Sequence, residues 1–155
     1  MLFWTIVFIT YHLAFIVRGN LYHDIMKKSG ELTLKQAETE DKKEKDNIAK
    51  ELVKKAWPIW IGSIILIAEI IYILSALKID VLKYPTAITL FYMIFVGLIL
   101  SKVNKEQKYD LKIEEDRTNY KLEIKKLKRY TFKGIISNLI YITYYCYMFY
   151  LLALK

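Results

Sequence analysis

The sequence predicts an all-α, polytopic integral membrane protein with four transmembrane helices and two cytoplasmic charged helical hairpins. The chain has 155 residues, of which 55% are hydrophobic and 26% are charged, and the two kinds are segregated along it. Apolar residues fill four blocks, at 1–17, 57–77, 84–101 and 134–154, whereas charged residues collect in 18–56 and 102–133. A helix of a soluble protein carries a polar stripe along one side, and these blocks carry none. We therefore expect the chain, 1–155, to form a single membrane domain.

Each apolar block is long enough to cross a bilayer as a helix. A transmembrane helix needs about 20 apolar residues, with a range of about 17–25, and the four blocks contain 17, 21, 18 and 21 residues. The first block has no Lys or Arg before Arg18 and no small-residue cleavage site. A secretory signal peptide has a basic N-terminal region and a cleavage site made of small residues. Because this block lacks both, we expect it to be a retained helix.

The distribution of basic residues predicts the orientation. The two long loops, 18–56 and 102–133, hold 21 of the 24 Lys and Arg residues. Basic loops stay on the cytoplasmic side during insertion. We therefore expect both loops inside the cell, and the turn 78–83 and both termini outside the cytoplasmic (inner) membrane. This topology accounts for the net charge of +8, so no nucleic-acid partner is expected.

The loop 18–56 is expected to fold back on itself as a helical hairpin. Residues 18–28 would extend the first span, Ser29-Gly30 would form the turn because Gly accepts positive φ, and 31–56 would be a second helix. Acidic residues precede basic residues by four positions in that stretch, as in Asp46 and Lys50, and such pairs stabilise exposed helices. Pro58 fits the first turn of a helix, with a bend at the membrane surface.

The loop 102–133 is expected to form two arms around a turn near 116–119. It ends in a basic cluster, made of Lys125, Lys126, Lys128, Arg129 and Lys133, which is interleaved with apolar and aromatic residues. Basic residues beside a membrane attract anionic lipid head groups. The cluster is therefore a candidate lipid-contact surface, although ordinary positive-inside topology explains the same charges.

One acidic residue, Glu69, lies inside an apolar block. It is 12 residues into the second span, which places it about 18 Å from the start of that span and near the middle of the membrane. Counting to the same depth in the other spans reaches three hydroxyl-bearing residues, Thr5, Thr89 and Tyr145. A shallower polar layer would pair His12 with Asn138. These residues could form an ion or proton site, a polar lock that specifies assembly, or a neutral Glu satisfied by hydroxyl groups.

The sequence contains no motif that predicts an enzyme. It has no phosphate-binding loop, no nucleophile elbow and no pair of His residues at a metal-binding spacing, and Cys146 is its single cysteine. We expect no catalytic residue, cofactor or metal. The leading hypothesis is a small membrane protein that binds or assembles protein partners, including further copies of itself, through its spans and basic hairpins. The main alternative is an oligomeric pore or permease, holin-like or ion-conducting, built on the polar layer around Glu69.

The layout of 1–101 resembles a known family. An outside N-terminus, one span, a charged cytoplasmic hairpin and two spans joined by a short turn are similar to the core of the oxidase-assembly (Oxa-type) membrane insertases. The resemblance implies a membrane-insertion factor as a second alternative. Bacterial insertases of this type use a basic residue in a hydrophilic groove, whereas the spans expected here contain no Lys or Arg.

Overall fold

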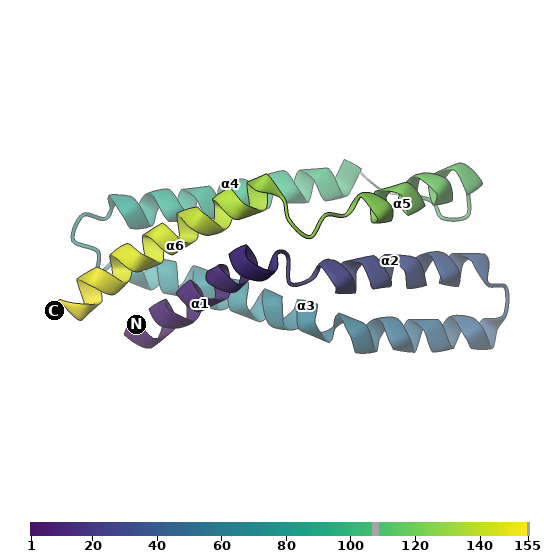
Figure 1. Cartoon of the computed structure of the whole chain (residues 1–155), viewed down its shortest axis with the longest axis horizontal. Coiled ribbons are helices and arrows are strands. Elements are labelled where there is room, and N and C mark those ends of the chain that lie inside the picture. The colour runs from purple at the N-terminus through teal and green to yellow at the C-terminus, as the bar shows by residue number, and fades with distance from the viewer. Residues whose placement is uncertain (107–108, 155) are drawn as a thin grey trace. The chain divides into compact units, whose positions relative to one another are not determined.

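The computed structural model describes residues 1–106 and 109–154, with side chains for 1–99 and 109–154. The described residues form six helices and no strand (Figure 1). The helices are α1 (Leu2–Arg18), α2 (His23–Glu38), α3 (Lys42–Ala76), α4 (Tyr84–Glu106), α5 (Glu114–Lys126) and α6 (Phe132–Ala153). The all-α class is therefore confirmed. Residues 107–108 of the expected second loop lie outside the described residues.

Two to three of the described helices could cross a membrane. Helices α3 and α6 are each long and apolar enough by themselves, and α1 and α2 qualify only as a pair that is bent at the break between them. Among the residues whose side chains the structure describes, α4 qualifies only as a shorter apolar helix, Tyr84–Ile99. The membrane character of the chain is consistent with these helices, whereas the arrangement of four spans stays a prediction.

The chain divides into two compact units. The apolar unit comprises Met1–Leu21, Ile64–Lys105 and Tyr130–Lys155, and the charged unit comprises Tyr22–Ser63 and Glu106–Arg129. Each unit combines segments that are distant in the sequence. Helix α3 belongs to both, since its first part, which contains the charged residues, lies in the charged unit and its apolar second part lies in the apolar unit.

The apolar unit buries polar residues beside its apolar core and exposes large apolar side chains to its surroundings. Its core contains residues from α1, α3, α4 and α6: Phe8, Tyr72, Ile73, Ala76, Met93, Tyr141, Tyr144, Tyr145 and Met148. Among the side chains of this unit that the structure describes, the buried polar residues are Thr5, His12, Glu69, Asp80, Thr86 and Thr89. Large apolar side chains are instead exposed, among them Ile64, Ile71 and Phe91, whose exposed fractions are 65%, 59% and 71%. Such a surface suits a hydrocarbon solvent better than water.

Helix α1 does not continue through the first arm of the loop 18–56, contrary to expectation. It ends at Arg18, and Gly19 adopts φ 75° and ψ −164°. An L-residue with a side chain rarely adopts that backbone conformation, whereas glycine does so at little cost. The expected continuous arm over 18–28 is therefore wrong, since a new helix begins at His23.

The expected turn at Ser29-Gly30 is also wrong. Helix α2 continues through both residues and ends at Glu38, and the chain turns at 39–41, where Asp41 Oδ1 accepts a hydrogen bond from the Lys43 amide. Gly30 is buried, and a Cβ atom added to it would lie 2.6 Å from Cδ1 of Ile124. Gly30 thus permits α2 and α5 to pack closely, which is a different use of glycine from turning the chain.

Two further local expectations are corrected by the helix boundaries. The turn expected near 116–119 lies inside α5, and the chain turns before it, where Asp116 Oδ2 accepts a hydrogen bond from the Asp110 amide. Pro58 lies in the interior of α3 rather than in the first turn of a helix, because α3 begins at Lys42.

Candidate functional site

A buried polar network surrounds Glu69 in the apolar unit. Glu69 lies on α3 and is 3% exposed. Its Oε1 atom lies 2.6 Å from His12 Nε2, on α1, and accepts a hydrogen bond of 2.8 Å from the hydroxyl of Tyr145, on α6. One carboxyl oxygen therefore joins three helices that are far apart in the sequence.

Asn138 extends the network on the other side of His12. Asn138 Oδ1 lies 2.8 Å from His12 Nδ1, and Asn138 Nδ2 donates a hydrogen bond of 2.7 Å to the Gly134 carbonyl oxygen. The amide nitrogen is the donor of Asn138 and its oxygen is an acceptor. His12 therefore carries a proton on Nδ1 and donates a hydrogen bond from it to Asn138 Oδ1.

This geometry permits two protonation states of the His12–Glu69 pair. The two groups share one proton. When Glu69 carries it, a carboxylic acid donates a hydrogen bond to a neutral imidazole. When His12 Nε2 carries it, an imidazolium donates a hydrogen bond to a carboxylate. In both states the pair has no net charge, and Tyr145 still donates to Oε1. The pair is therefore compatible with burial in an apolar unit, where an isolated charge would be costly.

Aromatic rings hold His12 in place. Its imidazole stacks on Tyr141, with ring centroids 4.7 Å apart and planes inclined by 12°, and it lies 5.8 Å from the ring of Tyr145. Phe8 lies 5.2 Å from Tyr145 on the next turn of α1. These contacts fix the plane of the imidazole, so that each ring nitrogen faces one partner.

The structure places the other two candidates of the deep layer elsewhere. The hydroxyl of Thr5 lies 2.7 Å from the Tyr72 hydroxyl, and the Thr89 hydroxyl donates to the Pro85 carbonyl oxygen of its own helix. Neither hydroxyl is bonded to Glu69. Thr in a helix often bonds the carbonyl four residues earlier, so its depth alone did not indicate its partner.

The two polar layers expected from the sequence meet at His12. Counting residues from the helix ends separated His12 and Asn138 from Glu69, whereas His12 bonds both. Counting treats helices as parallel rods and ignores the reach of the side chain. It therefore failed to identify His12 as the basic partner of Glu69.

A second buried carboxyl group, Asp80, was not singled out from the sequence. It is 2% exposed and accepts hydrogen bonds from the Leu82 amide, the amide and hydroxyl of Thr86, and the hydroxyl of Tyr147. Burial raises the pKa of Asp80, but the hydrogen bonds from Thr86, Tyr147 and Leu82 outweigh it and hold that pKa below its ordinary value. Asp80 thus fastens the 78–83 turn to α4 and α6, which is a structural role.

The basic cluster predicted for lipid contact is exposed but divided. Lys125, Lys126, Lys128 and Arg129 belong to the charged unit, whereas Lys133 belongs to the apolar unit, and all five side chains are exposed. Arg129 Nη2 lies 3.0 Å from Asp24 Oδ2. The hydrogen bond from His23 and the charge of Arg129 hold the pKa of the Asp24 carboxyl below its usual value. Part of the positive charge of the cluster is therefore balanced within the charged unit.

Comparisons with known proteins give no relative from which a function could be inferred, so function is inferred from this geometry. No protein-family model matches the chain, and no curated protein and no solved structure is significantly similar to it. Within the described residues, no three His, Cys, Asp or Glu side chains are grouped as ligands for a metal ion.

Proposed function

We propose that the chain is a four-span, non-enzymatic protein of the cytoplasmic membrane that binds or assembles protein partners. What supports four spans is that α1, α3, α4 and α6 contribute to one core, with an apolar exterior. The basic loops would be cytoplasmic and both termini outside, as the positive-inside rule predicts. Anionic lipids would surround the cytoplasmic ends of the spans.

The observation that carries partner binding is the folding of the charged segments into a unit of their own. Lys35 Nζ lies 3.0 Å from Glu44 Oε1, which joins α2 to α3. The close contact of Gly30 with Ile124 joins α2 to α5. An ordered helical surface with exposed charges of both signs provides complementary contacts for a protein partner. An unfolded charged loop would not hold its charges in a fixed arrangement.

Photo-cross-linking tests partner binding. A photoreactive residue would replace Lys43 or Lys112, both exposed on the charged unit, and a matched one would replace Phe91, which is exposed on the apolar unit. We expect discrete protein adducts from the first two positions in cells. Adducts with nascent membrane chains alone would favour the insertase, and lipid adducts at every position would contradict partner binding.

Cysteine accessibility tests the topology that the proposal assumes. In a Cys146→Ser background, a cysteine at Lys43 or Lys112 should react only after the membrane is opened, and a cysteine at Val81 should react in intact cells. Val81 is 72% exposed and serves better than its buried neighbour Asp80. Reaction of Lys43→Cys and Val81→Cys from the same side would refute the four-span arrangement.

The second candidate is a pore or permease, and the His12–Glu69 pair is the observation that favours it. An ionisable pair at membrane depth is a common feature of ion and proton pathways. The pair already has internal partners, Tyr145 on Glu69 and Asn138 on His12, so we rank a structural lock first. Selective ion flux in proteoliposomes that is abolished by Glu69→Gln, with folding intact, would reverse this ranking.

A further inference from the structure

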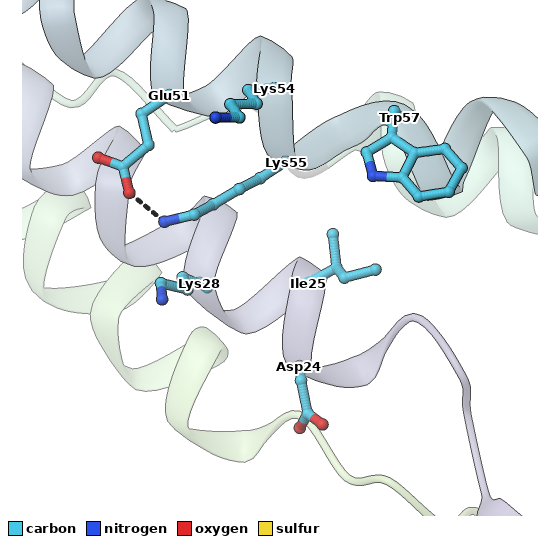
Figure 2. A pocket seen from close by; sticks show the side chains of 7 residues that line it. All are labelled: Asp24, Ile25, Lys28, Glu51, Lys54, Lys55 and Trp57. Carbon is cyan, nitrogen blue, oxygen red and sulfur yellow. Dashed lines mark hydrogen bonds and ion pairs between the residues drawn. The ribbon is translucent and has the colours of Figure 1, made fainter.

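The charged unit contains a cavity of about 510 Å³ between α2 and α3. Its lining is amphipathic and consists of Asp24, Ile25, Lys28, Glu51, Lys54, Lys55 and Trp57 (Figure 2). The ends of Lys28, Lys54 and Lys55 gather with Glu51 on one side of the cavity, and Trp57 and Ile25 lie on the other. A volume of this size is in the range of small-molecule sites.

The carboxylates of the cavity are already paired, whereas two of its lysines are not. Glu51 forms an ion pair with Lys55, and Asp24 forms one with Arg129. Among the side chains that the structure describes, Lys28 and Lys54 form no direct ion pair with a carboxylate, and the charge of Lys28 reaches Glu51 only as a minor influence beside that of Lys55. The polar end of the cavity therefore has two ammonium groups available for an anion.

The apolar end of the cavity points to a membrane surface. Trp57 is 60% exposed and begins the apolar part of α3, the helix that is long and apolar enough to cross a membrane. Trp side chains are enriched where a transmembrane helix enters the headgroup region. The cavity thus has its cationic end on the side away from the apolar segment and its aromatic end beside it, which is the order of a phospholipid's own polar and apolar parts.

We propose that this cavity binds the phosphate group of an anionic phospholipid. Lys28 and Lys54 would donate hydrogen bonds to the phosphate oxygens, as Lys does in other phosphate sites. Trp57 and Ile25 would contact the glycerol backbone and the first acyl carbons. The proposal requires that α3 crosses the membrane, and it is independent of whether the chain binds protein partners.

The test is lipid retention by the purified full-length protein in a neutral detergent, measured by native mass spectrometry with phosphatidylglycerol. The double variant Lys28→Gln/Lys54→Gln should bind the lipid about 30-fold more weakly, from the attraction of each Lys to an anionic head group. The matched control is Lys27→Gln/Lys50→Gln, which removes the same charge from the same two helices at exposed positions outside the cavity lining. The control should bind within about two-fold of the native chain, since its charges act through solvent.

Further arms test the apolar end of the cavity and identify the source of the phosphate. Ile25→Phe reduces the apolar end of the cavity without changing charge, and it should also weaken lipid binding. Phosphatidylcholine should bind more weakly than phosphatidylglycerol, and glycerol phosphate or inorganic phosphate should not compete at millimolar concentration. Equal losses in the two double variants, or full competition by a soluble phosphate, would overturn the proposal of a lipid site.

Discussion

Removing His12 is the most direct way to test the buried network. The change His12→Leu removes two hydrogen-bond partners. Glu69 Oε1 loses His12 Nε2, and Asn138 Oδ1 loses His12 Nδ1. A buried polar group that loses its partner costs about 1–3 kcal/mol, and hydrogen bonds between transmembrane helices average about 0.6 kcal/mol, with a maximum near 1.7. We expect His12→Leu to lower the free energy of unfolding by about 1–3 kcal/mol, because Glu69 is buried but keeps the hydrogen bond from Tyr145, and Asn138 is only partly buried.

The decisive measurement is a double-mutant cycle. Glu69→Leu should cost a similar amount, and His12→Leu/Glu69→Leu should cost clearly less than the sum, because the double variant leaves no uncompensated member of the pair. Unfolding in mixed micelles or by steric trapping gives the required free energies. Thr10→Val is the matched control, since the Thr10 hydroxyl is exposed and bonds only the Ile6 carbonyl oxygen of its own helix. Single costs that add to within about 0.5 kcal/mol would refute the pairing.

Three further predictions concern single positions. Glu69→Gln should cost about 0.5–1.5 kcal/mol, because a Gln amide in the place of Oε1 can bond either His12 or Tyr145 but not both. Glu69→Lys should prevent assembly, judged by gel filtration, because it places a cation beside His12. Gly30→Ala should destabilise the chain relative to Gly97→Ala in the same unfolding assay, because the new Cβ meets Ile124 in the first case and nothing within 4 Å in the second. The pKa of Asp80 is lower in the folded chain than its ordinary value of 3.8. Its contribution to stability is therefore fully present above that ordinary value and is lost as the pH falls through the folded pKa. An unfolding series that descends from about pH 6 to below the ordinary value should be flatter for Asp80→Asn, and parallel curves would contradict this.

The sequence predicted the elements of the network that depend on composition. A carboxyl group within an apolar block is rare enough to mark Glu69 as an interior residue, and Tyr145 followed from its depth in the fourth block. The network places His12 against Glu69 because their side chains reach across the helices. No count along a single helix contains that information.

Local signals with two physical meanings account for the wrong boundaries. A glycine after a serine in a charged loop predicts a turn at Gly30, but a glycine also permits close helix packing, and only the position of Ile124 distinguishes the two uses. The charge pairs at four-residue spacing predicted a helix over 31–56. Such pairs stabilise a helix on either side of a break equally well, so they gave no warning of the extended backbone at Thr39.

The His12–Glu69 pair has a consequence for biosynthesis. In the proposed topology α1 and α3 enter the bilayer before α6, which supplies Tyr145 and Asn138. A chain that stops before α6 therefore carries an incompletely bonded ionisable pair, and a chain that lacks α1 carries a lone acid at a depth where an acid costs about 2.5–3.5 kcal/mol. Truncated products would therefore expose an unsatisfied ionisable group in the membrane. The chain would satisfy that group only after α6 has been inserted.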